Sequence, residues 1–131
     1  MSNNIRLPWY LVCDHRLTEP EGTFVSPGYP QDYPAAVKCS WTIIAPAKYY
    51  IILKFNEFVT EAGHDMLEVI EASNSYKRPT YSGISKPDNY ISRSNVLVLK
   101  FSSDQTEEKK GFNITYKFRA SGKLAIETSL G

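Results

Sequence analysis

The sequence predicts an all-β protein, a two-sheet antiparallel β-sandwich, and three observations lead to that fold class. Apolar and polar residues alternate along several segments, which is the pattern of strands that are covered on one face. Aromatic residues are abundant, including nine tyrosines, and eight prolines with other turn formers separate the segments. No segment carries the apolar stripe of an amphipathic helix. Two sheets packed face to face would bury the apolar side of every strand.

The first strands are expected where the alternation begins. A short apolar strand that contains Gly22 comes first. Residues 39–44 form the next predicted strand, in which Trp41 and Ile43 share a face. The longest predicted strand spans residues 49–58. Its isoleucine, leucine and phenylalanine at every second position, from residue 51 to residue 55, share one face. These segments supply the first half of the expected core.

The second half of the chain supplies three further strands, at residues 66–72, 96–102 and 112–118. The last of them is the clearest, because aromatic and branched residues alternate there with polar ones over its whole length. The apolar faces of all strands are expected to meet in one core. The residues predicted to be buried together are Trp41, Leu53, Phe55, Leu99, Phe101, Phe112 and Ile114.

Length and charge exclude several classes of protein. A chain of 131 residues is long enough for one compact domain with a real core. Its net charge of +1 provides no basic excess for binding nucleic acid or another polyanion. No apolar run has the length of a transmembrane span. Residues 1–11 lack the basic start and apolar core of a secretory signal, which favours a linker or an added start.

The two cysteines, Cys13 and Cys39, flank the most informative segment of the chain. Composition alone is compatible with two free thiols in a cytosolic protein, as well as with a disulfide. Between the cysteines lie the sequence Ser-Pro-Gly-Tyr-Pro, which ends at Pro30, and a second Tyr-Pro pair that begins at Tyr33. Trp41 follows the second cysteine after one residue. No common compositional bias produces this order of motifs.

Residues 13–118 resemble a CUB domain, an extracellular β-sandwich module with a jelly-roll-like fold. The resemblance begins with the cysteine, Ser-Pro-Gly-Tyr-Pro, Tyr-Pro and Cys-x-Trp pattern. It continues in the second half with family-like motifs in the family order and spacing. These motifs are Phe55-x-x-Phe58, Asp65-x-Leu-Glu-Val69, Ser82-Gly83, Asn95-x-Leu-x-Leu-x-Phe101-x-Ser-Asp104 and Gly111-Phe112.

The resemblance implies domain boundaries and a disulfide. Residues 1–12 would be an N-terminal segment or linker, 13–118 the CUB domain, and 119–131 a C-terminal extension, linker or tag. In the family the first two cysteines are bonded, so a Cys13–Cys39 bridge is expected, which indicates an oxidising, extracellular location. The usual second disulfide is missing, because Ser82 stands in the place of one cysteine. The loop between Glu61 and Asp65 is also shorter than is usual.

The resemblance further implies a Ca²⁺ site. Many CUB domains hold the ion with three carboxylates, which correspond by position to Glu61, Asp65 and Asp104. Ca²⁺ takes roughly six to eight hard oxygen ligands, so carboxylates on neighbouring loops suit it. Solvated surface acids are the alternative, and the short loop is the feature that argues for it.

In calcium-binding members of the family, this site commonly meets a lysine of a partner protein. The same acids, with Tyr29 packed on the lysine stem, are therefore expected to form the partner-binding surface. Alternatively, Tyr29 is a turn aromatic that covers the core. If the acids bind no ion, recognition would rest on tyrosines of the loops, Tyr29, Tyr33 and Tyr90.

The remaining candidates are weaker. His15 and His64 are the only histidines, and no catalytic Ser/His/Asp or Cys/His set can be assembled. Glu57 and Glu61 could be paired as catalytic carboxylates, but a small sandwich is not expected to have a cleft for them. Asn113 begins an N-glycosylation sequon, Asn-Ile-Thr. No catalytic residue is therefore predicted.

The sequence thus predicts a non-catalytic extracellular module that binds another protein, in a Ca²⁺-dependent manner, as part of a larger secreted or cell-surface protein. A glycan-binding adhesin or lectin of CUB-like fold is one alternative. The accessory domain of a modular protease, whose activity lies outside this chain, is another. A shared fold implies a class of role and not a particular ligand.

Overall fold

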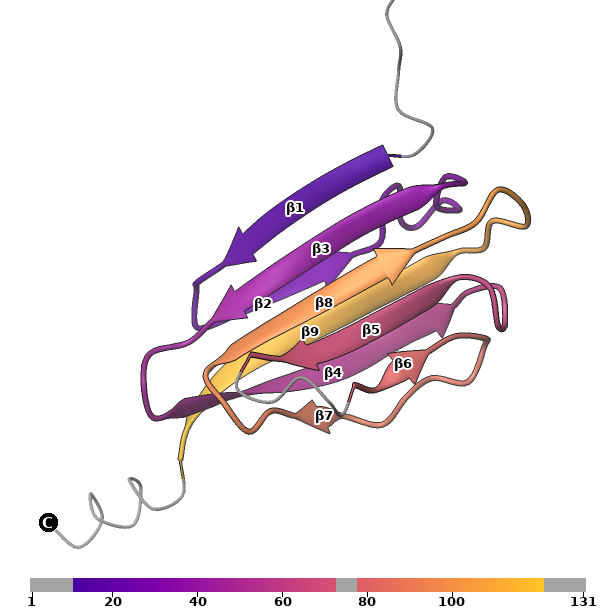
Figure 1. The fold of residues 1–131 in the computed structure, drawn as a ribbon. Coiled ribbons are helices and arrows are strands. Elements are labelled where there is room, and N and C mark those ends of the chain that lie inside the picture. Colours follow the sequence, from indigo (N-terminus) through magenta and orange to yellow (C-terminus); the bar gives the residue numbers. More distant parts are fainter. Residues whose placement is uncertain (1–10, 73–77, 122–131) are drawn as a thin grey trace, which may run out of the picture.

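The structure is a computed structural model that describes residues 11–72 and 78–121. Over these residues the chain forms strands and loops, arranged as two stacked sheets (Figure 1). Within the same residues there is no helix with the length and apolar character that crossing a bilayer demands. The strands are β1 Leu11–Leu17, β2 Glu21–Val25, β3 Val37–Ile44, β4 Tyr49–Val59, β5 Met66–Glu71, β6 Thr80–Tyr81, β7 Tyr90–Ile91, β8 Val96–Ser102 and β9 Gly111–Ala120.

The strands form a five-stranded sheet, in the order β1-β3-β8-β5-β6, and a four-stranded sheet, in the order β2-β9-β4-β7. Every neighbouring pair is antiparallel except β1 with β3, which run parallel. The predicted all-β sandwich is confirmed. The parallel pair was not foreseen, and it is possible because the chain crosses to the other sheet as β2 between β1 and β3.

Six of the nine strands, β2, β3, β4, β5, β8 and β9, lie where the sequence placed them, and three were missed. β1 carries Asp14, His15 and Arg16 in its middle, and it lies at the edge of its sheet, so its sequence lacks a clean alternation. β6 and β7 have two residues each, which is too short for any periodic signal. Their positions follow from pairing with β5 and β4, which no local pattern reports.

The core lies between the sheets, and all seven residues predicted for it are at most 2% exposed. Aromatic rings fill its centre. Phe112 lies at the middle of this group and packs edge-to-face against two rings. Its ring centroid is 5.5 Å from that of Trp41 and 5.1 Å from that of Phe101. Such pairs add to the free energy gained by burying their area.

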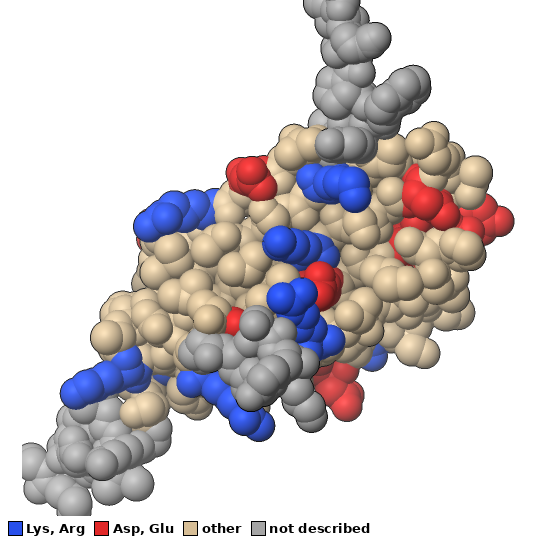
Figure 2. Space-filling view, viewed as in Figure 1, with Lys and Arg blue, Asp and Glu red and all other residues tan. Residues whose placement is uncertain are grey.

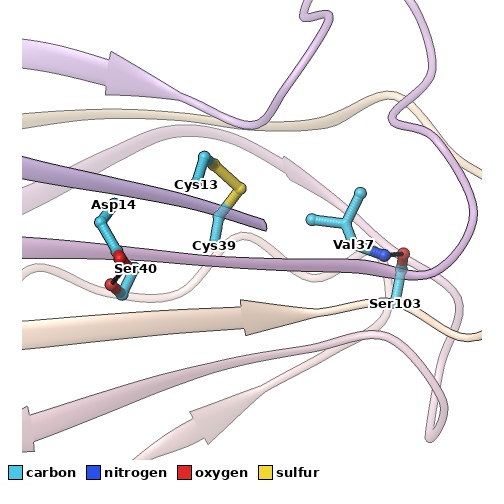
Figure 3. Close-up of a disulfide and its surroundings, with 6 residues drawn as sticks. All are labelled: Cys13, Asp14, Val37, Cys39, Ser40 and Ser103. Atoms are coloured by element: carbon cyan, nitrogen blue, oxygen red, sulfur yellow. Dashed lines mark hydrogen bonds between the residues drawn. A yellow bond between two sulfur atoms is a disulfide. The ribbon is translucent and has the colours of Figure 1, made fainter. Parts of the chain in front are cut away.

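The predicted disulfide is present, because Cys13 and Cys39 are bonded (Figure 3). The two residues are direct partners in the β1–β3 register, with Cα atoms 4.5 Å apart. The loop that the disulfide closes contains β2, which belongs to the other sheet. In the unfolded chain the bridge therefore restricts segments that belong to both sheets of the folded domain. Beside it, Ser40 donates a hydrogen bond to Asp14, which further fastens the edge strand.

The loops gather at two opposite ends of the sandwich (Figure 1). The β2–β3, β4–β5 and β8–β9 loops lie together at one end, called here the loop end. The β3–β4 turn and the β7–β8 loop lie at the other end. All three acids that were expected to bind Ca²⁺ belong to the loop end.

Candidate functional site

Asp65 holds two loops of the loop end together. Its side chain is fully buried, at 0% exposure, immediately before β5. Oδ2 accepts a hydrogen bond of 2.6 Å from the Tyr33 hydroxyl, and Oδ1 accepts one of 2.9 Å from the backbone N–H of Asp104. A carboxylate has about four lone-pair sites, so both oxygens can still accept a further ligand.

Tyr33 is the residue around which these loops are arranged. Its hydroxyl donates to Asp65 and accepts a hydrogen bond of 3.2 Å from the backbone N–H of Glu61. Burial, together with the bond to Asp65, raises the pKa of Tyr33, so the hydroxyl keeps its proton. Because Tyr33 is 1% exposed, it is buried in the structure and is not among the residues that a partner could touch, contrary to the fallback expectation from the sequence.

Glu61, His64 and Asp104 converge on one point. One ligand atom from each lies within 4.8 Å of the others. His64 Nδ1 is 3.4 Å from Asp104 Oδ2, and both side chains are partly open to solvent. The sequence named Glu61 and Asp104, together with Asp65, as metal ligands, but it did not name His64.

The carboxylate of Glu61 lacks a partner that would compensate its negative charge. Its Oε1 atom is buried and has no hydrogen-bond partner among the described residues. Burial and, second, repulsion from the Asp104 carboxylate raise the pKa of Glu61. A buried acceptor without a partner is costly, and a cation between Glu61 and Asp104 would relieve both the missing contact and the repulsion.

The donor set fits Ca²⁺. Hard carboxylate oxygens are the ligands that this ion prefers, and Glu61 and Asp104 offer them from two adjacent loops. Asp65 is not one of the three converging side chains, but it binds the backbone of Asp104 directly and holds that residue in place. The His64 nitrogen would suit a transition metal better than Ca²⁺.

Hydrogen bonds join the two segments between which the usual second disulfide is missing. Thr60 and Gly83 bond reciprocally, since the Thr60 N–H donates to the Gly83 carbonyl at 2.9 Å and the Gly83 N–H donates to Thr60 Oγ1 at 3.0 Å. Thr60 Oγ1 itself donates to the Asp65 carbonyl at 2.9 Å. Ser82 Oγ accepts from the Gly63 N–H at 3.0 Å. We call these contacts the Thr60–Ser82 clamp.

Tyr29 has an intramolecular partner. Its hydroxyl donates to Glu57, which raises the pKa of Tyr29 and lowers that of Glu57. The Lys110 ammonium lies 3.0 Å from Glu57 Oε2 and 5.7 Å from the centre of the Tyr29 ring. The half-buried tyrosine therefore belongs to a surface cluster with these two charges.

Asn113 lies on the outer face of β9, in a row of polar side chains. Asn56 Nδ2 donates to Asn113 Oδ1 at 3.0 Å and to Thr115 Oγ1 at 2.8 Å. Thr23 on β2 continues the row through its contact with Thr115. Both the asparagine and the threonine of the sequon are partly exposed.

The fold and the motifs can now be compared with known proteins. A family model described as CUB domain matches residues 13–116. This chain belongs to the CUB family. Its disulfide, its two-sheet sandwich and the motifs that follow Phe55 are therefore those of a CUB domain that lacks the second bridge.

Relatives of this CUB domain are much longer proteins. Human Tolloid-like protein 2 is 31% identical over 121 residues, which cover 88% of this chain and 12% of the relative. Mouse Procollagen C-endopeptidase enhancer 2 is 38% identical over 115 residues, which cover 82% of this chain and 28% of the relative. The chain thus spans only a small part of the curated relatives that it matches.

Solved structures agree with the fold. The full extracellular region of zebrafish Gpr126/Adgrg6 contains a match with a TM-score of 0.75 and 34% identity, covering 81% of this chain and 14% of that one. The MASP-1 CUB2 domain bound to Ca²⁺ matches with a TM-score of 0.70 and 25% identity, covering 79% of this chain and 96% of that one.

Proposed function

We propose that this chain is a non-catalytic extracellular interaction module that recognises a partner protein at its loop end and binds Ca²⁺ there. The observation that carries the proposal is the unpaired buried oxygen of Glu61, on a side chain that converges with the Asp104 carboxylate. A similar fold has been solved with Ca²⁺ bound, as the MASP-1 CUB2 domain, and that likeness supports the choice of ion.

Each residue of the site has a distinct role in the proposal. Glu61, Asp65 and Asp104 hold the ion, which supplies the positive charge that the carboxylates lack. Tyr33 positions two of them, because its hydroxyl binds both the Asp65 side chain and the Glu61 backbone. Asp65 in turn fixes Asp104 through the backbone. The Thr60–Ser82 clamp holds the β4–β5 loop against the Ser82–Gly83 turn.

The partner in this proposal offers a lysine side chain to the exposed part of the site. The Asp104 side chain is 37% exposed, so its carboxylate can meet an ammonium from outside. Tyr29 already receives the ammonium of Lys110 over its ring, which supports a role in packing on a lysine stem. No nucleic acid is proposed as a partner, since the net charge of +1 offers no basic excess.

An extracellular location rests on the disulfide and on the sequon. A disulfide persists in oxidising compartments. Asn113 and Thr115 lie on an exposed sheet face, where a glycan on Asn113 would project into solvent, and we propose that it carries one. The relatives Tolloid-like protein 2 and Procollagen C-endopeptidase enhancer 2 suggest that the module belongs to a larger protein of that kind.

The test is a pair of melting curves, in Ca²⁺ and in EDTA, for the natural chain and two variants. Ca²⁺ should raise the melting temperature, because a ligand that binds only the folded state stabilises it by mass action. Asp104→Asn should abolish that increase. Glu108→Gln, at an exposed acid of the same β8–β9 loop, should keep it.

Three outcomes would reject parts of the proposal. Equal melting temperatures in Ca²⁺ and EDTA would reject the ion site. A response to Ca²⁺ that survives Asp104→Asn would move the ion elsewhere. Partner capture that free sugars compete away, without any effect of EDTA, would favour a lectin-like function over lysine recognition.

A further inference from the structure

A hollow lies at the end of the sandwich opposite the candidate Ca²⁺ site. It is a cleft of about 400 Å³ between the β3–β4 turn, which contains Lys48, and the β7–β8 loop, which contains Arg93. Tyr49, Tyr50 and Ile91 form the apolar part of its lining. Because the calcium-site loops occupy the other end (Figure 1), this cleft is a separate surface with its own chemistry.

The charge of this cleft is positive. Lys48 and Arg93 are exposed in its lining, and none of the described residues that line it carries a carboxylate. Neither residue takes part in an ion pair between described side chains. Arg119 lies next to Tyr50 in the β4–β9 register and extends the positive surface along the sheet. In Figure 2 blue side chains predominate at this end, while red side chains gather at the loop end on the right.

Exposed apolar side chains accompany these cations. Ile91 is 60% exposed and lies beside Ile52 in the β4–β7 register, and Tyr49 is 37% exposed. Ile91 belongs to β7, the last strand of the four-stranded sheet, whose outer edge pairs with no other described strand. Exposed tyrosine and arginine side chains are enriched at protein-binding surfaces, and Tyr49 and Arg93 supply both here.

A buried carboxylate makes the wall of the cleft rigid. Glu71 is 4% exposed, and its Oε2 atom accepts hydrogen bonds of 2.7 Å from the Tyr90 hydroxyl and 2.9 Å from the Arg93 backbone N–H. Its Oε1 atom accepts one of 3.0 Å from Ser94 Oγ. These donors all belong to the segment that forms the cleft wall. Burying a carboxylate without such donors is costly. The hydrogen bonds to Glu71 therefore fix the loop that presents Arg93.

Further contacts hold the same loop. Ser92 Oγ accepts from the Ile51 N–H at 2.8 Å and donates to the Ser94 carbonyl at 2.7 Å. Asn95 Nδ2 donates to the Ala45 carbonyl at 2.8 Å, which joins the β7–β8 loop to the β3–β4 turn. Both walls of the cleft are thus fastened to each other. Ordering these walls would therefore take little from the free energy of binding a ligand.

We propose that this cleft binds an acidic, extended segment of a partner protein in which a large apolar side chain lies between carboxylates. The carboxylates would pair with Lys48 and Arg93, and arginine can bind a carboxylate in a bidentate manner. The apolar side chain would cover Ile91 and Tyr49. A sulfated polysaccharide would satisfy the cations but has no apolar side chain to cover Ile91. This surface is independent of Ca²⁺ and does not rest on the proposed function of the loop end.

The test measures the binding of a short fluorescent peptide, with one phenylalanine flanked by glutamates, to the full chain by fluorescence anisotropy. Binding should be equal in Ca²⁺ and in EDTA, and it should weaken as salt rises. The Lys48→Gln/Arg93→Gln variant should weaken it about tenfold or more. Lys86→Gln, at an exposed lysine of the β6–β7 loop, should leave it unchanged.

Peptide controls keep the test decisive even if a protein variant folds poorly. Replacing the glutamates by glutamines, or the phenylalanine by glycine, should each weaken binding to the natural chain. The proposal is overturned if the peptide does not bind, if either peptide change has no effect, or if the folded Lys48→Gln/Arg93→Gln variant binds as the natural chain does. Binding of a heparin fragment without binding of the peptide would also overturn it, in favour of a glycan.

Discussion

At the scale of the residue, Glu61 and Asp65 show how environment separates two acids of one loop. Both oxygens of Asp65 receive hydrogen bonds, from Tyr33 and from the Asp104 backbone. One oxygen of Glu61 is buried without a described donor, beside the negative charge of Asp104. Asp65 is therefore a structural anchor as well as a proposed ligand, whereas Glu61 lacks a compensating contact among the described residues.

The raised pKa of Glu61 predicts how stability depends on pH when no ion is bound. A carboxyl group whose pKa is higher in the folded state than in the unfolded state binds its proton more tightly in the folded state. Stability is therefore gained as pH falls through the folded-state pKa, and it is lost above that pKa. In EDTA at about pH 7, Glu61→Gln should raise the melting temperature, because it removes the charge.

Two comparisons check this prediction. At about pH 4, where Glu61 is largely protonated in the folded state, Glu61→Gln and the natural chain should melt alike. Glu108→Gln, which changes an exposed acid of the loop end, should have little effect at either pH. Destabilisation by Glu61→Gln in EDTA would show that the charged form of Glu61 is compensated, which contradicts the uncompensated carboxylate.

At the scale of the element, a β-bulge decides which residues of β4 face the core. Strict alternation from Phe55 would place Glu57 inward, but the register with β9 shifts between Phe55 and Glu57. Phe58 consequently lies opposite Phe112 in the core, at 2% exposure. The same shift turns Thr60 inward, at 1% exposure, where its side chain joins the clamp.

The contacts of the Thr60–Ser82 clamp predict that Thr60 contributes to the stability of the domain and to its affinity for Ca²⁺. Thr60→Val keeps the shape of the side chain but removes the donor to Asp65 and the acceptor for Gly83. It should lower the free energy of unfolding by about 1–3 kcal/mol, because buried polar groups lose their partners. It should also weaken the affinity for Ca²⁺, which a change in general stability alone would not do. Urea unfolding and a Ca²⁺ titration measure the two effects.

Thr60→Ser is the matched control, because it keeps the hydroxyl. It should retain most of the Ca²⁺ affinity and lose only the packing of one methyl group. Equal affinities for Thr60→Val and the natural chain would mean that the backbone bond between Thr60 and Gly83 suffices to hold the loop.

At the scale of the whole molecule, one covalent bond and two differently charged ends organise the domain. The bridge between Cys13 and Cys39 encloses the whole of β2, so it links the folding of the two sheets. The proposed calcium site is at the acidic loop end, and the cleft with Lys48 and Arg93 is at the other end. A net charge of +1 conceals this separation of charge.

Removing the bridge should weaken the whole domain and not only its edge. A Cys13→Ala/Cys39→Ala variant should lose about 3–4 kcal/mol of unfolding free energy, since the 26-residue separation sets the entropy of the closed ring. Urea unfolding gives this difference. A reducing agent should destabilise the natural chain to a similar extent and leave the variant unchanged. A loss well under about 1 kcal/mol would show that β1 contributes little to the cooperative unit.

The sequence by itself determined the class of fold, the strands that alternate clearly, the residues of the core and, through its motifs, the family and the disulfide. These features depend on neighbouring residues or on the spacing of motifs along the chain, such as the alternation from Phe112 to Phe118. It also named Glu61 and Asp104, because their motifs flank regular strands.

Only the tertiary structure decided what those residues do. Tyr33 meets Asp65 across 32 residues, and Asp104 meets Asp65 across 39, so no local pattern reports either contact. The inward turn of Thr60 follows from the pairing of β4 with β9, and the rigid wall that presents Arg93 follows from the burial of Glu71. The physical reason is that the surroundings of a polar group depend on segments far away in the chain. The alternation of apolar and polar residues, in contrast, is a property of each strand's own sequence.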